Sequence, residues 1–416
     1  MFYGWWIVAA GFVLQLLNGV LLFNSFGIYF VLLREEFKWS KTVISGAFSM
    51  ARTESGVLGP LQGWLIDRFG PRLIVTIGLL LFGIGFMLLS QVNSIITFYL
   101  VFLLMSIGSS LGGFMAVSTS VANWFARKRA TAMGLAMTGM GVGGLLVPVL
   151  AWFLDAYGWR AVAFYSGVII IVIGLPVAQL MRRRPEDHGY LPDGAVPIGR
   201  PSGTTSADMS TRSVIPGYSA REAMRTRAFW LLAIGHASAL LVVGAVMVHL
   251  VPHIHDDVGL SLRTAGMVVA VMTAMDIMGR LVGGVLGDRI NKRIGVVVCM
   301  AGHSLGLLAL AFATNLPMVL LFAVVHGLAW GARGPMLMSI RADYFGRASY
   351  GTIMGFSSLI MMMGMTLGPI FAGVMADQFG DYRIGFIVLA GLAALGSITF
   401  MFARKPAEPA AVGAPD

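Results

Sequence analysis

Two charged residues interrupt a long apolar stretch of the chain. Asp276 and Arg280 lie in residues 273–287, inside an apolar run of roughly two dozen residues, which is long enough to cross a bilayer. Four residues apart on a helix, their side chains share one face and lie about 6 Å apart along the axis. A charge at bilayer depth is costly unless it faces protein or a water-filled cavity, so this pair must be neutralised, functional, or both.

Such a pair can couple anion binding to protonation. A guanidinium offers a planar fork of donors that fits a carboxylate, and a low dielectric strengthens the contact. With the site empty, ionised Asp276 neutralises Arg280. A substrate anion competes for the arginine, and protonation of Asp276 removes its competitor, so that anion and proton enter together. The alternative is a permanent salt bridge that only fixes helix packing.

Three further charges fall within apolar segments. Arg333, in residues 330–335, is expected at a depth close to that of Arg280, either as a second anion contact or bound to backbone carbonyls. Arg52 and Glu54 are two residues apart, so they point to different faces of a helix and do not pair with each other. They predict either a gating pair between two halves of the protein or simple structural pairing.

The composition identifies the medium around these charges. Of the 416 residues, 57% are hydrophobic and only 12% are charged, and the mean hydropathy is +0.82. A soluble chain would carry about twice that charged fraction. The net charge of +10 does not indicate nucleic acid, because in a membrane chain the placement of Lys and Arg matters more than their sum. A single cysteine excludes a disulfide framework and a four-cysteine metal site.

The chain is predicted to be an all-α membrane protein with twelve transmembrane helices. The predicted spans are 5–31, 41–66, 73–91, 95–122, 130–154, 160–181, 227–251, 264–287, 294–313, 317–340, 350–376 and 384–403. The long break at 182–226 is rich in Gly, Pro, Ser and Thr, which is typical of a flexible linker. Its last part, 219–227, predicts a basic amphipathic helix on the membrane surface. The expected domains are therefore two six-helix bundles, 1–181 and 227–403, joined by this cytoplasmic linker and followed by a cytoplasmic tail, 404–416.

The distribution of Lys and Arg predicts the orientation. With the N-terminus inside, twenty of the 29 Lys and Arg residues, Arg341 among them, fall on the cytoplasmic side, six fall outside and three fall within spans. This bias predicts that both termini are cytoplasmic, in a protein of the inner (plasma) membrane.

Three motifs of the first half recur in the second half, each displaced along the sequence by nearly the same number of residues. They are Gly63-x3-Asp67-Arg68-x-Gly70-x-Arg72 with Gly284-x3-Asp288-Arg289-x-Asn291-x-Arg293, Trp124-Phe125-x-Arg127 with Tyr344-Phe345-x-Arg347, and Asp155-x2-Gly158-Trp-Arg160 with Asp377-x2-Gly380-Asp-Tyr-Arg383. Parallel halves of six spans are the construction of major facilitator transporters, which hold their substrate near the midplane between the halves.

The first of these motifs looks like the signature loop of the major facilitator superfamily. Glycines let two helices approach, while Asp67 caps a helix end and pairs with a cytoplasmic arginine. The resemblance implies a conformational latch in which the gating residues are Asp67, Arg68, Arg72, Asp288, Arg289 and Arg293. Asn291 replaces a glycine in the second copy, which predicts a weaker latch there. The alternative is that Arg68 and Arg72 only anchor the loop on the cytoplasmic side, in line with the positive-inside rule.

A narrower resemblance concerns residues 123–143, which are similar to the span 4–5 signature of monocarboxylate transporters and bacterial oxalate/formate antiporters. Tyr3-Gly4-Trp5-Trp6 resembles the opening of span 1 in monocarboxylate transporters, without their acidic residue. The Asp-x3-Arg of span 8 looks like their paired charge. In that family the arginine binds the substrate carboxylate and the aspartate participates in proton coupling, which implies these roles for Arg280 and Asp276.

The resulting prediction is a monomeric, proton-coupled symporter of a short monocarboxylate such as L-lactate or pyruvate. It is not expected to be an enzyme or to need a cofactor or metal. Arg280 would bind the substrate together with Arg333, and the apolar walls would be Phe26, Ile28, Phe114 and Trp330.

An organic-anion exchanger of the oxalate/formate type is the alternative. Oxalate antiporters place a lysine in span 11, and residues 350–376 contain no Lys or Arg. This favours a monoanion unless Arg333 or Arg52 substitutes. Among the histidines, His236 is expected to bind a core carbonyl, and His303 and His326 are candidates for a proton path.

Overall fold

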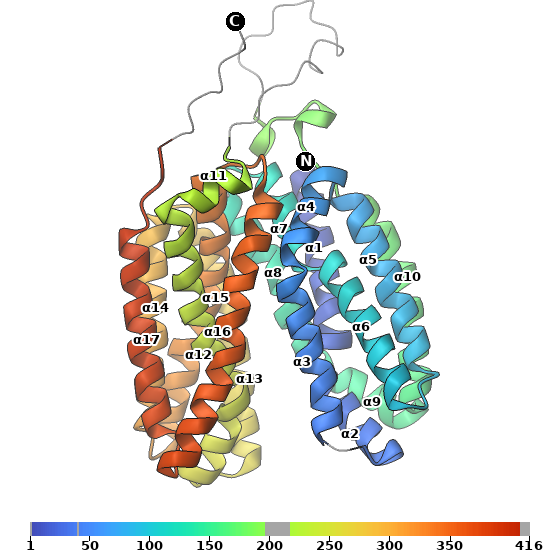
Figure 1. Cartoon of the computed structure of the whole chain (residues 1–416), viewed down its shortest axis with the longest axis vertical. Helices are drawn as coiled ribbons and strands as arrows, with labels where there is room; N and C mark the ends of the chain where they lie inside the picture. Colours follow the sequence, from blue (N-terminus) through green and yellow to red (C-terminus); the bar gives the residue numbers. More distant parts are fainter. Residues whose placement is uncertain (1, 40, 196–216, 408–416) are drawn as a thin grey trace, which may run out of the picture.

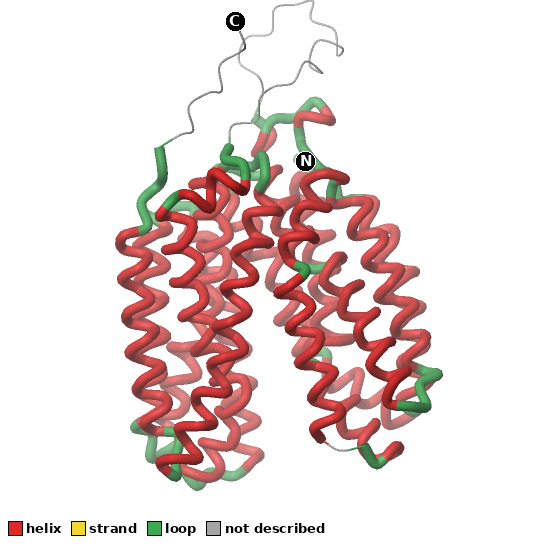
Figure 2. Tube along the Cα trace, in the orientation of Figure 1, coloured by secondary structure: helices red, strands yellow, loops and turns green. Residues whose placement is uncertain are grey.

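The computed structural model describes residues 2–39, 41–195 and 217–407. The helices form two groups that lie side by side, one from each half of the chain (Figure 1). Over the described residues the regular elements are helices, joined by short loops (Figure 2). The start of α1 and the described parts of the segment between the halves, residues 182–195 and 217–219, lie at the same end of the molecule (Figure 1), here called the linker end. The opposite end is called the far end.

The N-terminal half contains six spans, four of which are interrupted. In order they are α1 (Gly4–Asn18), the π-helix η1 (Gly19–Phe23) and α2 (Phe26–Phe37); α3 (Lys41–Val57) and α4 (Gly59–Phe69); α5 (Pro71–Leu89); α6 (Ile95–Gly112) and α7 (Phe114–Trp124); α8 (Arg129–Leu145) and α9 (Val147–Tyr157); and α10 (Trp159–Gln179). The breaks before α4 and α9 precede Pro60 and Pro148, because proline lacks the N–H that a continuous helix needs. The bend between α8 and α9 is 41°.

The C-terminal half has longer, mostly continuous helices. They are α12 (Arg227–Pro252) with the π-helix η5 (His253–Asp257), α13 (Leu262–Gly287), α14 (Lys292–Ala311), α15 (Leu316–Phe345), α16 (Tyr350–Phe379) and α17 (Arg383–Phe402). Before them, α11 (Ala220–Arg225) begins with a capping box between Ser219 and Glu222 and lies across the linker end (Figure 1). This short helix occupies the place where an amphipathic helix was predicted.

One predicted boundary was wrong in a way that affects function. Span 10 was expected to end at residue 340, which placed Arg341 in a cytoplasmic loop. Instead α15 continues to Phe345 and ends at Gly346, whose φ of 74° suits glycine. Arg341 is therefore a helical residue, and it is 1% exposed.

These helices account for a twelve-helix membrane protein built from two six-helix pseudo-repeats. Among the described residues, ten helices are long and apolar enough to cross a membrane, and α8 with α9 makes an eleventh span. The remaining span is α3 with α4, which is broken at Leu58 and contains Arg52 and Glu54. Its lower hydropathy follows from those charges.

The two halves touch at the linker end and diverge toward the far end (Figure 1). Glycines allow the contact: a Cβ on Gly63 of α4 would lie 2.0 Å from the carbonyl oxygen of Gly351 on α16, and a Cβ on Gly134 of α8 would lie 2.4 Å from that of Arg280 on α13. Two pairs of helices, α4 with α16 and α8 with α13, thus approach each other closely across the interface between the halves.

Candidate functional site

Asp276 and Arg280 form an ion pair inside α13, as the four-residue spacing requires. Arg280 Nε and Nη2 both lie 2.8 Å from Asp276 Oδ2. The side chain of Asp276 is only 7% exposed and that of Arg280 only 12%. The other carboxylate oxygen, Oδ1, is buried and has no hydrogen-bond partner among the described residues. The pair is therefore neutral as a unit but incompletely satisfied.

The surrounding helices place this pair at the junction of the halves. Arg280 Nη1 donates to the carbonyl oxygen of Met137 on α8, at 3.2 Å, so the guanidinium already reaches the N-terminal half. On the other side, α15 packs closely on α13, since a Cβ on Gly331 would lie 2.0 Å from the carbonyl oxygen of Asp276. Rotation of one half against the other would move α8 relative to α13, and it would change the environment of the pair directly.

Arg333 is placed differently from the prediction of a second anion contact. It is 1% exposed, and its Nε lies 3.3 Å from His303 Nε2 on α14, so it points away from the interface between the halves. His303 Nδ1 lies 3.2 Å from His326 Nδ1.

The tautomers of this cluster follow from the arginine. Because a guanidinium only donates, His303 accepts at Nε2 and its Nδ1 carries the hydrogen given to His326. His326 then keeps its hydrogen on Nε2, which is buried without a partner among the described residues. Neither His303 nor His326 then has a ring nitrogen free to accept a further proton, so the arrangement favours a structural role over a proton path.

The predicted apolar wall residues lie in both halves. Phe26 on α2 packs against Phe102, with 5.3 Å between the ring centroids. Ile28 on α2 and Phe114 on α7 are half-buried. Trp330 on α15 is also half-buried, and its ring centroid lies 6.3 Å from that of His326.

Glu54 is bound within the N-terminal half and forms no ion pair among the described residues. Its carboxylate accepts from Ser110 Oγ at 3.0 Å, Ser55 Oγ at 3.1 Å and Gln62 Nε2 at 3.2 Å. This corrects the expectation of a gating ion pair between the halves at this residue. The side chain of Arg52 lies outside the described part of the structure.

Two aspartates from the repeated motif hold the halves together at the linker end. Asp67, at the end of α4, accepts from Gly351 N at 3.1 Å and from Thr352 N and Oγ1 at 2.7 Å each. Asp288, after α13, accepts from Ala130 N and Thr131 N at 2.8 Å each. Each carboxylate thus caps the first turn of a helix from the other half, where unsatisfied N–H groups and the helix dipole attract an anion.

In both copies of this Asp-Arg motif, the arginines form no ion pair across the interface among the described residues. Arg68 is exposed, 5.6 Å from the ring of Trp64, and Arg72 donates to the carbonyl oxygen of Gln179 in its own half. Arg289 is exposed, and Arg293 is half-buried. The arginine that contacts Asp67 is Arg183, which donates to its backbone carbonyl and not to its carboxylate.

Asn291 also has a role that the motif comparison missed. Its φ is −65°, whereas Gly70 has φ +84°. The second copy therefore needs no glycine at this position, and the Asn291 side chain caps α14 by accepting from Arg293 N at 3.0 Å.

Sequence reasoning also missed several polar contacts that join the halves and the linker. Arg129 of α8 pairs with Asp343 of α15, whose other oxygen lies 2.6 Å from Lys292 Nζ. Arg347 donates to the carbonyl oxygen of Asn123 at 2.6 Å and to Glu186 of the linker at 2.8 Å. For Arg347 the sequence did contain an indication of such a contact, because this residue belongs to a repeated motif at a predicted loop.

The first part of the linker is docked on the N-terminal half. The carboxylate of Asp193 accepts from the backbone N–H groups of Ala126, Arg127 and Lys128. His188 stacks on Trp124, with 6.3 Å between ring centroids. Burial, and then the charge of Arg182, lower the pKa of His188 below its ordinary value, so the docked linker favours the neutral form of its ring.

The histidines of the far end bind locally. His253 Nδ1 lies 2.7 Å from Asp257 Oδ2 and its Nε2 lies 3.0 Å from the carbonyl oxygen of Leu310, while His249 Nε2 lies 2.9 Å from that of Pro369. Within the described residues, no group of three or more His, Cys, Asp or Glu side chains is close enough together to hold a metal ion.

Comparison with known proteins agrees with this architecture. The sequence pattern of the Major Facilitator Superfamily matches residues 11–252 and 232–416. Human monocarboxylate transporter 11 is 29% identical over 96% of this chain and 82% of its own length. Monocarboxylate transporter 2 of Mesocricetus auratus is 24% identical over 95% of this chain and 83% of its own length.

Solved structures show the same fold. The Escherichia coli fucose:proton symporter superimposes with a TM-score of 0.71 at 15% identity, over 98% of this chain and all (100%) of that one. The human organic anion transporter TETRAN superimposes with a TM-score of 0.66 at 16% identity, over 95% and 98% of the two chains. The chain therefore belongs to the Major Facilitator Superfamily, as an integral membrane transporter, rather than an enzyme, that resembles the monocarboxylate transporters.

Proposed function

We propose that this transporter carries a short monocarboxylate, such as L-lactate or pyruvate, together with a proton. The observation that supports this most is the buried Asp276–Arg280 pair, with its unpartnered carboxylate oxygen, at the junction of the halves. The monocarboxylate transporters to which the chain is similar add the substrate class.

In this mechanism, substrate and proton act on the two members of one ion pair. The substrate carboxylate takes the Nε–Nη2 edge of Arg280 that Asp276 now occupies. Asp276 then loses its counter-ion. A proton bound at Oδ1, which has no other hydrogen-bond partner among the described residues, would neutralise the carboxylate. Binding of the anion and binding of the proton therefore favour each other, which is the thermodynamic condition for symport.

We further propose that the linker end faces the cytoplasm of the inner (plasma) membrane and that the described conformation is closed there. The two aspartate caps and the Arg129–Asp343 pair lie at this end. Opening this end would break these contacts as one half rotates against the other. The protein is expected to work as a monomer, because each chain contains both halves.

Uptake of labelled L-lactate into liposomes tests this function. With acid outside, the wild type should accumulate lactate in proportion to the pH gradient, and Arg280→Gln should lose this uptake. Arg160→Gln is the matched control, since Arg160 forms an ion pair with Glu36 in the N-terminal half, away from the candidate site. Uptake that ignores the pH gradient and requires a preloaded anion would replace symport by organic-anion exchange.

A further inference from the structure

Arg341 is a buried cation without a carboxylate partner. It is 1% exposed, and no ion pair forms at this residue in the described part of the chain. Its Nη2 lies 3.1 Å from His236 Nδ1 on α12 and 3.7 Å from Met361 Sδ on α16. Its Nη1 is buried and has no hydrogen-bond partner within residues 2–39, 41–195 and 217–407. The three helices therefore enclose the guanidinium without neutralising it.

His236 does not supply a negative charge either. Because arginine only donates hydrogen bonds, His236 Nδ1 must accept, so the ring is neutral with its hydrogen on Nε2. This differs from the expectation that His236 binds a core carbonyl. Other arginines near the interface have acidic partners: Arg280 pairs with Asp276, and Arg129 with Asp343. Arg341 differs from these two, because it has no acidic partner among the described residues.

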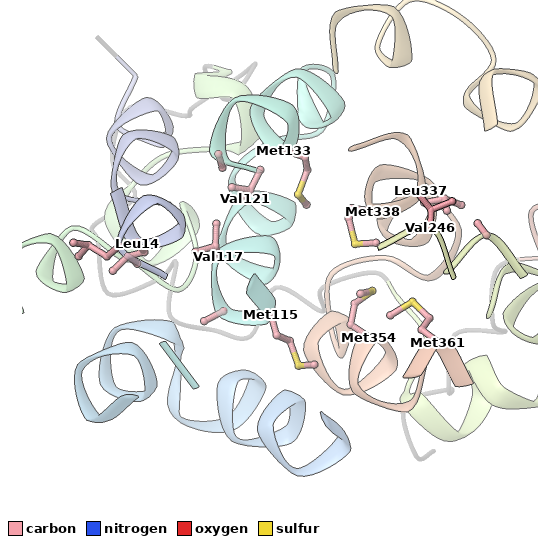
Figure 3. Packing of buried hydrophobic residues seen from close by; sticks show 14 of the residues in the cluster. Leu14, Met115, Val117, Val121, Met133, Val246, Leu337, Met338, Met354 and Met361 are labelled. Carbon is pink, nitrogen blue, oxygen red and sulfur yellow. The ribbon is translucent and has the colours of Figure 1, made fainter. Parts of the chain in front are cut away.

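Met361, whose Sδ lies 3.7 Å from Arg341 Nη2, belongs to a group of methionines at the interface between the halves (Figure 3). Met115 and Met133 of the N-terminal half and Met338, Met354 and Met361 of the C-terminal half gather there and are here called the methionine cluster (Figure 3). All five are buried, with exposures between 1% and 9%. Thioether side chains are unbranched and repack readily, so displacement of Met361 would uncover Arg341 Nη2 without a change in the helices.

Arg341 lies at nearly the same depth as Arg280, slightly closer to the linker end. Arg341 is four residues before the end of α15 and Arg280 is seven before the end of α13, so their Cα atoms lie about 6 Å and about 10 Å from that end. When the linker end opens, the C-terminal half leaves α4, α7 and α8, and its part of the methionine cluster becomes a wall of the new cavity.

We propose that Arg341 is a second anion site, which takes the carboxylate that Arg280 releases once the linker end opens. The ligand is the small organic anion itself, held by the Nη1 and Nη2 donors, one of them free and the other covered by Met361. This inference rests on the proposed role of Arg280 in anion transport. Arg333, the other buried arginine without an acidic partner, is not such a site because it points to His303 and away from the interface.

Side-specific kinetics test the second site. The KM for L-lactate is measured from each face, in right-side-out and inside-out membrane vesicles, for the wild type and for Arg341→Gln. The loss of a charge-assisted pair at the linker end should raise the KM on that face about tenfold or more. The KM on the far face should stay within about twofold, since Arg280 is intact.

Two further variants separate binding from folding. Arg333→Gln is the matched comparison: it should lower the melting temperature as Arg341→Gln does, but change both KM values by the same factor. Arg341→Lys keeps the charge without the fork, so it should raise the KM at the linker face by less than Arg341→Gln. Equal KM changes on both faces for the two Arg341 variants, or no change at all, would overturn the second site. Lactate uptake that survives Arg280→Gln would instead overturn the proposed function.

Discussion

Replacement of Asp276 by asparagine should separate the charge at the candidate site from its shape. Arg280 donates twice to one oxygen of Asp276, at 2.8 Å. Removal of one partner of a buried ion pair leaves the other charge unpaired, which costs about 3–5 kcal/mol. Without ligand, Asp276→Asn should therefore unfold at a clearly lower temperature than the wild type.

The same substitution should strengthen anion binding. In the wild type a carboxylate must displace Asp276, whose negative charge holds Arg280 more strongly than the neutral amide of asparagine would. With hydrogen bonds to charged groups worth about 1.5–3 kcal/mol, the variant should bind lactate about tenfold more tightly or better. Saturating lactate should then raise its melting temperature more than it raises that of the wild type.

Transport should change in the opposite direction. Asparagine cannot carry the proton, so Asp276→Asn should exchange lactate across liposomes without accumulating it in response to a pH gradient. Asp377→Asn, an exposed acid on α16, is the control and should keep the coupling. If Asp276→Asn still accumulates lactate under a pH gradient, or is stabilised less by lactate than the wild type, the reasoning from the ion pair is refuted.

Three further predictions concern the contacts around the site. Asp67→Ala should remove the cap on α16 at a cost of about 1 kcal/mol and increase hydrogen exchange in the first turn of that helix. Unchanged exchange would show that the cap does not hold the linker end. Glu54→Gln should leave pH-driven uptake within about twofold of the wild type, because its partners are neutral hydroxyl and amide groups; loss of coupling would assign Glu54 to the proton route. Because the docked linker lowers the pKa of His188, docking should be complete near neutral pH and weaken as the pH falls through the range in which free histidine protonates. Tryptophan fluorescence should report this change in the wild type but not in His188→Gln, and a pH response in both would contradict it.

Much of the fold follows from local rules that act along the chain. The number of spans follows from apolar length, and the two-fold construction follows from motifs repeated at one spacing. The Asp276–Arg280 pair was predictable because residues four apart on a helix must share a face. Interrupted spans were harder to predict, since Pro60 and Pro148 break helices that hydropathy alone shows as continuous.

The partners of most other charges were decided only by the tertiary structure. The sequence does not indicate that Asp67 would cap α16, that Glu54 would bind two serines and a glutamine, or that Arg129 would meet Asp343. Arg341 was assigned to a loop by its position and proved to be buried without an acidic partner. The physical reason is distance along the chain: hydropathy and helical spacing are local, whereas each of these contacts depends on how separate helices pack, several of them across the two halves.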